Sequence, residues 1–158
     1  MFANFIRKTL YLFLIIARAI FFVMIIGAPL SMFYYENSYF NPISVWSIFF
    51  SMFYMFNYFN VARHLLRIVK SCEDTPFTKD SVKSFRIMGI SLFINSIVEC
   101  ITTYHGSQNL GNLQIFANDS GAITPVMIIC VVSSLMCFVV ADAFNAAVRI
   151  KEENDLTI

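Results

Sequence analysis

Four long apolar stretches, separated by short polar connectors, organise the chain. They cover about residues 10–34, 43–68, 83–104 and 122–148. A helix needs about 20 residues to cross roughly 30 Å of hydrocarbon, and each stretch provides that length. Strands of a membrane barrel would alternate between apolar and polar residues over about 10 positions, and these stretches do not alternate. The pattern predicts an all-α integral membrane protein whose four spanning helices pack as an antiparallel bundle.

A polar segment, residues 63–86, interrupts the apolar pattern in the middle of the chain. It carries six of the 11 lysines and arginines: Arg63, Arg67, Lys70, Lys79, Lys83 and Arg86. Four more flank the first and last apolar stretches: Arg7, Lys8, Arg149 and Lys151. The two remaining connectors, residues 36–41 and 105–121, contain neither lysine nor arginine.

This asymmetry predicts the orientation of the chain, because cytosolic loops of membrane proteins are enriched in lysine and arginine. We expect both termini, a basic loop at 69–82 and a tail at 149–158 to lie in the cytosol. The first apolar stretch exceeds the about 7–15 residues of a secretory signal, so we expect an uncleaved span. The prediction is a multi-pass protein of the plasma membrane, with one transmembrane domain over residues 1–158.

The composition agrees with a bilayer as the solvent of this chain. Its residues are 58% hydrophobic and 13% charged, whereas soluble domains average about 45–50% apolar and about 25% charged. A soluble chain of this size would leave roughly a third of its unfolded surface exposed and could not hide so many apolar residues. The loop cations are attributed to topology and lipid contact, so we expect the bilayer as a partner and no direct nucleic-acid partner.

The sequence contains no residue pattern typical of catalysis or metal binding. There is no HExxH, GxSxG or P-loop motif, and the four cysteines lack metal-site spacing. His64 and His105 are expected on opposite sides of the membrane, so they cannot share a site. We interpret the cysteines as small packing residues and expect neither a cofactor nor enzymatic activity.

Two residues of opposite charge are expected inside the spans at similar depth. Arg18 lies ten residues beyond Lys8, roughly 15 Å deep, and Asp142 lies seven residues before Arg149, about 10 Å deep. A lone charge at the bilayer centre costs about 2.5–3.5 kcal/mol on insertion scales, and pairing lowers that cost. We expect the two side chains to meet between the first and fourth helices. They would form a structural clamp, with snorkelling of Arg18 as the alternative, or a charge site that binds or switches.

The third apolar stretch carries a polar face with a carboxyl group in its outer half. Ser91, Asn95, Glu99 and Thr102 follow steps of four, four and three residues, which places them on one face of a helix. Two interpretations of Glu99 stay open. It is a neutral, hydrogen-bonded acid that helps helices associate, or a proton- or cation-sensing group that faces an outer cleft with His105 near its mouth.

A second polar stripe lies in the inner half of the second stretch. Its members are spaced by three, four and three residues: Asn57, Asn60, His64 and Arg67. With Asp142 and Asn145 they would line a pocket open to the cytosol. The alternative is that Asn57 and Asn60 hydrogen-bond between helices and that His64 is an interface residue.

Two short motifs resemble those of a known family. Thr75-Pro76-Phe77-Thr78 precedes Val82, Phe85, Arg86, Ile87 and Gly89, and the last residues are Glu153-Asn154-Asp155-Leu156-Thr157-Ile158. With four spans in 158 residues, the chain is similar to a bacterial four-span membrane family of unknown function, domain of unknown function 2975. The resemblance implies no catalytic residue. Members are often encoded beside a small helix-turn-helix regulator, which implies a regulatory pair.

The function expected from these features is non-enzymatic. We expect a small membrane regulator or sensor that engages a cytosolic partner, with a helix-turn-helix transcription regulator as the candidate. The end of the tail is a candidate docking segment, because acidic residues precede an apolar pair there: Asp155, Leu156, Thr157 and Ile158. The alternative is a small transporter or channel-like homo-oligomer that uses the charges inside the spans.

Overall fold

The computed structural model describes residues 2–34, 42–71, 78–106, 115–118 and 121–155. Four long helices form most of this part of the chain: α1 (Phe2–Tyr34), α2 (Pro42–Ser71), α3 (Lys79–Gly106) and α4 (Pro125–Asp155). Two short strands, β1 (Phe116–Asn118) and β2 (Gly121–Ile123), pair antiparallel just before α4. The all-α prediction is therefore confirmed, with this small ribbon as its one addition in the described residues.

The start of α4 differs slightly from the predicted start of the fourth stretch. Residues 122 and 123 belong to β2, and the helix begins at Pro125. Thr124 precedes it and accepts a hydrogen bond from the backbone N–H of Met127 at 3.2 Å. Threonine is a favoured cap, and proline fits the first helical position because that position needs no N–H donor.

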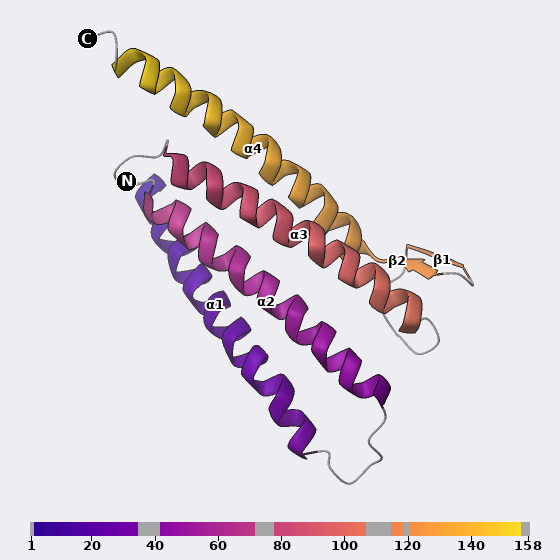
Figure 1. Ribbon diagram of the computed structural model, residues 1–158. Helices are drawn as coiled ribbons and strands as arrows, with labels where there is room; N and C mark the ends of the chain where they lie inside the picture. The colour runs from indigo at the N-terminus through magenta and orange to yellow at the C-terminus, as the bar shows by residue number, and fades with distance from the viewer. Residues whose placement is uncertain (1, 35–41, 72–77, 107–114, 119–120, 156–158) are drawn as a thin grey trace.

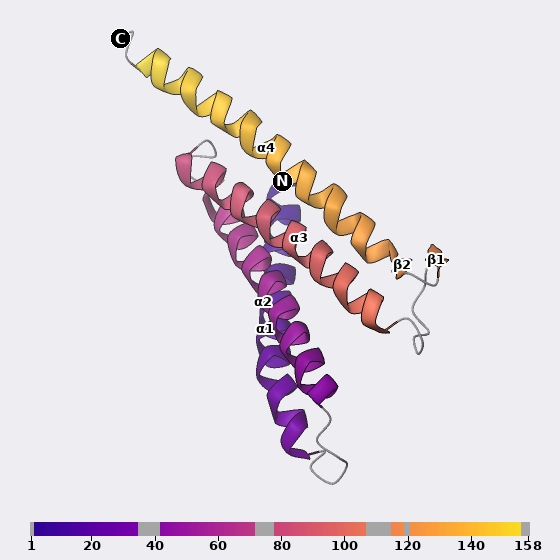
Figure 2. The ribbon, with the colours of Figure 1, turned by 45° about the vertical axis from the view of Figure 1, so that its right-hand side comes forward.

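The helices are arranged in a row in sequence order. Helix α1 packs on α2, α2 on α3, and α3 on α4, and each helix runs back beside the previous one (Figure 1). Figures 1 and 2 show that the hairpins α1–α2 and α3–α4 meet where α2 ends and α3 begins, and then diverge. The described helices thus form an open row, and this arrangement does not confirm the predicted four-helix antiparallel bundle.

The distribution of side chains is the reverse of that in a soluble domain. Large apolar side chains are exposed along α1 and α4, for example Phe13, Val23, Ile129 and Val139. The buried set is rich in small polar residues: Ser81, Ser84, Ser91, Ser96, Thr103 and Ser134. Small and polar residues at helix contacts, with apolar residues facing outward, are typical of helices in lipid.

Three of the helices contain segments long and apolar enough to cross a membrane. They are Phe5–Gly27, Lys79–Thr103 and Pro125–Asn154, and they indicate a membrane protein. Helix α2 falls below this hydropathy level because asparagines and tyrosines interrupt its apolar residues.

The tightest contact between helices joins α3 to α4. The hydroxyl of Ser134 donates a hydrogen bond of 2.8 Å to the backbone oxygen of Gly89. A Cβ atom added at Gly89 would lie 3.0–3.3 Å from three ring atoms of Phe138. Further along the same interface, the rings of Phe85 and Phe144 pack with centroids 5.2 Å apart. Helix α4 can therefore approach α3 this closely only because residue 89 has no side chain.

Candidate functional site

A cluster of polar side chains connects α2, α3 and α4 near the middle of the row. We call it the polar centre and define it by six residues: Tyr54 and Tyr58 of α2, Asn95 and Glu99 of α3, and Thr124 and Cys130 at or in α4. In both helical pairs the members are four residues apart, so each pair lies on one helix face.

A chain of contacts crosses from α2 to α4 within the polar centre. The hydroxyl oxygens of Tyr54 and Tyr58 are 3.2 Å apart, and the Tyr58 hydroxyl lies 3.3 Å from the sulfur of Cys130. On its other side, the Tyr58 ring stacks on Phe21 of α1 with a centroid distance of 5.7 Å. Tyr58 therefore contacts α1 through its ring and α4 through its hydroxyl group, and it links these two helices through the polar centre.

Glu99 is the acidic member of the polar centre and links α3 to the start of α4. Its Oε1 atom accepts a hydrogen bond of 3.2 Å from the hydroxyl of Thr124, the residue that caps α4. The geometry thus places Glu99 in a hydrogen-bonded setting between helices. The side chain of His105, expected near Glu99, lies outside the described part of the chain.

Two buried asparagines carry the polar face of the α2–α3 contact. Asn95 has 0% exposure, and its Nδ2 donates to the backbone oxygen of Tyr54 at 3.5 Å. Within the described chain, Asn95 Oδ1 accepts no hydrogen bond and Asn57 Nδ2 donates none. An unpaired buried polar group costs about 1–3 kcal/mol. The packing of α2 on α3 is therefore expected to lose stability if another polar or charged group without a partner is introduced beside these two amides.

The register between α2 and α3 explains where the second predicted stripe lies. His64 Nδ1 lies 3.3 Å from the hydroxyl of Ser84, which makes His64 an interface residue. Counting back along the antiparallel pair from this contact places Asn57 level with Ser91, which is also buried. Asn60 is half-buried on the same helix. Three members of the stripe therefore lie along or beside α3.

The pocket predicted between this stripe and the fourth helix is not formed in the described residues. Asp142 and Asn145 are exposed on α4, and α3 lies between α4 and α2. The prediction required α2 and α4 to face each other at the level of Asp142 and Asn145, whereas the contact from Tyr58 of α2 to Cys130 of α4 lies near the start of α4.

The predicted pair of Arg18 and Asp142 is also corrected. Asp142 Oδ1 lies 3.7 Å from an amino nitrogen of Arg86, whereas the Arg18 guanidinium lies 5.4 Å from the ring centroid of Phe59. The reason is the order of the helices: α1 and α4 lie at opposite ends of the row, and α3 supplies the nearest cation to Asp142 (Figure 1). The arginine in α1 instead makes a cation–π contact, which is worth about 0.5–1 kcal/mol when exposed.

The first part of the predicted tail continues α4 as a helix through Asp155. Glu152 Oε1 lies 2.7 Å from Lys79 Nζ at the start of α3, so the helical part of the tail contacts its own chain. Both side chains are more than half exposed, so the pair contributes about 0–1 kcal/mol. The other members of the candidate docking segment, Leu156, Thr157 and Ile158, lie outside the described residues.

Four members of the polar centre were not among the residues that the sequence singled out: Tyr54, Tyr58, Thr124 and Cys130. The sequence did contain a signal for Thr124, because a threonine followed by a proline is typical of a helix start. The tyrosines were hidden in a helix crowded with aromatic residues. Their hydroxyl groups distinguish them only when the facing helix is known.

Replacement of Thr124 by valine should destabilise the protein by about 1–2 kcal/mol, because it removes a helix cap and a hydrogen bond to Glu99. Thr124→Ser should restore most of the loss, since serine keeps the hydroxyl. The matched control is Thr102→Val, whose exposed hydroxyl bonds only to the backbone of its own helix. Thermal unfolding in detergent measures all three, and equal losses for the two valine variants would contradict this role of Thr124.

Comparison with known protein families identifies a match over most of the chain. The family model described as "Protein of unknown function (DUF2975)" matches residues 36–158. This segment includes α2, α3 and α4 and therefore the whole polar centre, and it leaves α1 outside. No curated protein and no solved structure matches the chain.

Proposed function

The chain belongs to the DUF2975 family of proteins of unknown function, and from its own geometry we propose that it is a non-enzymatic membrane regulator. In this role, the polar centre inside the membrane senses a change and the cytosolic surface of the helices engages a cytosolic regulatory protein. A helix-turn-helix transcription regulator is the candidate partner. Both chain ends lie in the cytosol in this proposal, and the membrane is the plasma membrane.

The proposal places α2 across the membrane together with the three more apolar helices. Its 30 residues extend about 45 Å, which is more than the hydrocarbon thickness. Trp46, Phe49 and Phe56 are exposed on its surface, whereas Asn57 is buried. The apolar side chains of α2 would therefore face lipid, while the amide of Asn57 is enclosed by protein. The average hydropathy of the helix counts Asn57 as if it faced lipid and so understates how well α2 fits a membrane.

The observation that carries the proposal is a cationic surface formed by the last turns of α2 and the first turns of α3. Its residues are exposed: Arg63, Arg67, Lys70, Lys83 and Arg86. Helix α4 extends alongside to Asp155 and adds exposed acidic residues, of which Glu152 holds Lys79. A surface of mixed charge on rigid helices can specify the register of a protein partner.

Site-specific photo-crosslinking in cells tests the proposal. A photo-reactive amino acid at Asp80, which is exposed between the cations of α3, should give one discrete protein adduct. At Phe13, which is 65% exposed on the apolar surface of α1, it should give none. The charge reversal Lys83→Glu should abolish the adduct at Asp80. Identical products at both positions, or an adduct that ignores the charge reversal, would contradict the regulatory role.

A second candidate function, transport by a homo-oligomer, is favoured by the polar side chains of the polar centre: Tyr54, Tyr58 and Cys130 are in contact, and Glu99 accepts a hydrogen bond from Thr124. Polar and ionisable groups inside a membrane mark routes for protons or small cations. Flux into proteoliposomes that is lost in Glu99→Gln would support transport. Absence of flux together with a specific adduct would support regulation.

A further inference from the structure

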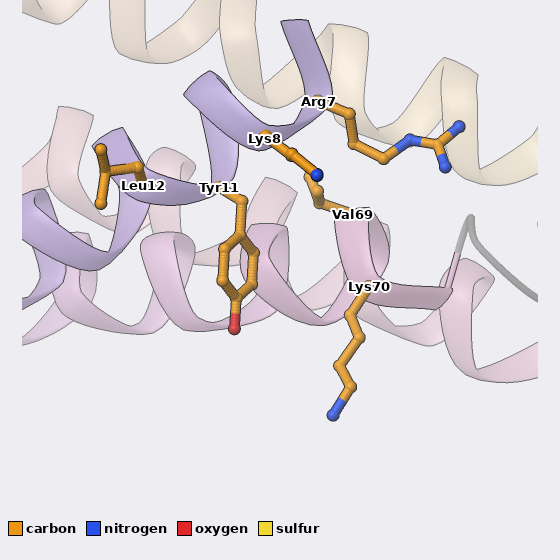
Figure 3. Close-up of a pocket in the computed structure, with 6 residues that line it drawn as sticks. All are labelled: Arg7, Lys8, Tyr11, Leu12, Val69 and Lys70. Carbon is orange, nitrogen blue, oxygen red and sulfur yellow. The ribbon is translucent and has the colours of Figure 1, made fainter. Parts of the chain in front are cut away.

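A pocket of about 420 Å³ lies beside the first turns of α1 and the last turns of α2. Figure 3 shows that its lining comes from both helices: Arg7, Lys8, Tyr11 and Leu12 from α1, and Val69 and Lys70 from α2. The pocket lies on the α1–α2 hairpin, whereas the polar centre is formed by α2, α3 and α4 and the salt bridges of α4 lie on the opposite side of the row.

The lining combines positive charge with apolar surface. Arg7, Lys8 and Lys70 supply three cations and Tyr11 supplies a hydroxyl group, while Leu12 and Val69 supply apolar surface. None of the six residues is acidic. In the described part of the chain, no salt bridge engages any of these three cations. The pocket is therefore suited to a ligand that is anionic at one end and apolar at the other.

The place of the pocket along α1 narrows the choice of ligand. The apolar run begins at Leu10, two residues after Lys8, and the side chains that follow are mostly exposed, as Phe13 illustrates. This is the level at which headgroups meet hydrocarbon around α1. A lipid whose headgroup occupies the pocket could lay its acyl chains along the exposed apolar surface of the helix.

The directions of the charged side chains indicate the kind of headgroup. Figure 3 shows that the Arg7 guanidinium and the Lys70 ammonium point in different directions instead of converging on one point. A single small anion could not contact both groups well. A headgroup with two phosphates spreads its negative charge over a distance that suits separated cations, and basic pockets of membrane helices recognise such headgroups.

We propose that the pocket binds the headgroup of an anionic phospholipid of the cytosolic leaflet, with the phosphates held by Arg7, Lys8 and Lys70 and the glycerol region against Leu12 and Val69. This site shares Lys70 with the cationic surface proposed above and rests on the orientation proposed there, with the first turns of α1 at the cytosolic headgroup level. Its test measures lipid binding alone, so its outcome does not depend on whether a regulatory protein binds.

Native mass spectrometry of the full chain in detergent tests the proposal, with cardiolipin and phosphatidylcholine as lipid probes and inorganic phosphate as the soluble probe. The triple variant Arg7→Gln/Lys8→Gln/Lys70→Gln removes the three cations of the pocket. The matched control is Arg63→Gln/Lys83→Gln/Lys151→Gln, which removes three exposed cations that do not line it. Lys8→Glu alone repeats the test with one exposed side chain changed, in case the triple variant does not fold.

Cardiolipin should bind at least about tenfold more tightly than phosphatidylcholine, because each cation near an anionic headgroup contributes a factor of roughly five. The pocket variants should lose this preference, and the control should keep it within about twofold. An equal loss in pocket variant and control would overturn the proposal, since it would indicate general attraction to positive charge. Binding of inorganic phosphate with the same dependence on the variants would also overturn it, in favour of a soluble phosphate ligand.

Discussion

Replacement of Asn95 by aspartate is expected to prevent stable folding of the protein. The side chain is fully buried between α3 and α2, and its Nδ2 faces the backbone oxygen of Tyr54 at 3.5 Å. Aspartate has nearly the same shape but replaces this donor with a carboxylate oxygen, which repels the carbonyl. A buried charge without a partner costs several kcal/mol, a large part of the total stability of a protein of this size.

Asn145→Asp is the matched control for this substitution, because Asn145 is exposed on α4. The amount of folded protein, measured by size-exclusion chromatography of detergent extracts, should fall sharply for Asn95→Asp and stay near the parent level for Asn145→Asp. Similar amounts of the two variants would show that residue 95 is not enclosed by α2, and the position of α3 between its neighbours would be contradicted.

Replacement of Gly89 by leucine should separate α3 from α4. Even the first carbon of the new side chain would lie 3.0–3.3 Å from the ring of Phe138, and the remaining three carbons have no space in the interface. Overpacking of this kind costs about 1–3 kcal/mol. Movement of α4 away from α3 would also break the hydrogen bond from Ser134, worth about 0.5–1.5 kcal/mol.

Gly27→Leu is the control, since a Cβ atom at Gly27 would meet no atom within 4 Å. Both glycines lie in helices, so both variants gain the same helix propensity from the replacement. The midpoint of thermal unfolding should therefore fall for Gly89→Leu and stay equal or rise for Gly27→Leu. A parent-like midpoint for Gly89→Leu would mean that the α3–α4 contact is not close at this residue.

The helical content of the chain could be predicted from its sequence because lipid imposes a simple rule. A backbone in hydrocarbon must satisfy its own hydrogen bonds, so long apolar stretches become helices. The stripes of polar residues were also informative: Ser91 and Asn95 are both buried at helix contacts, as their spacing on one face suggested. Periodicity identifies the face of a helix that is unlike the others, and in a membrane that face packs on protein.

The order of the helices could not be predicted in the same way. The depths of Arg18 and Asp142 matched, but depth does not reveal which helices are neighbours. Arg86 lies at a similar level on α3 and forms the contact with Asp142. The feature that decides the neighbour of α4 is Gly89, a single residue whose effect depends on Phe138 and Ser134 of the facing helix. Contacts of this kind have no period along the chain.

The central claim is that all four helices cross the membrane, with both chain ends in the cytosol. Cysteine labelling tests it most directly, in a background in which the four native cysteines are replaced by serine. Single cysteines at Asp80, Ile115 and Lys151 would report the start of α3, the residue before β1 and the end of α4, all exposed positions. With four spans, a membrane-impermeant maleimide added to intact cells should label only the cysteine at 115, and all three after permeabilisation. If α2 stayed outside the membrane, the labels would appear at 80 and 151 and not at 115, and that result would contradict the account.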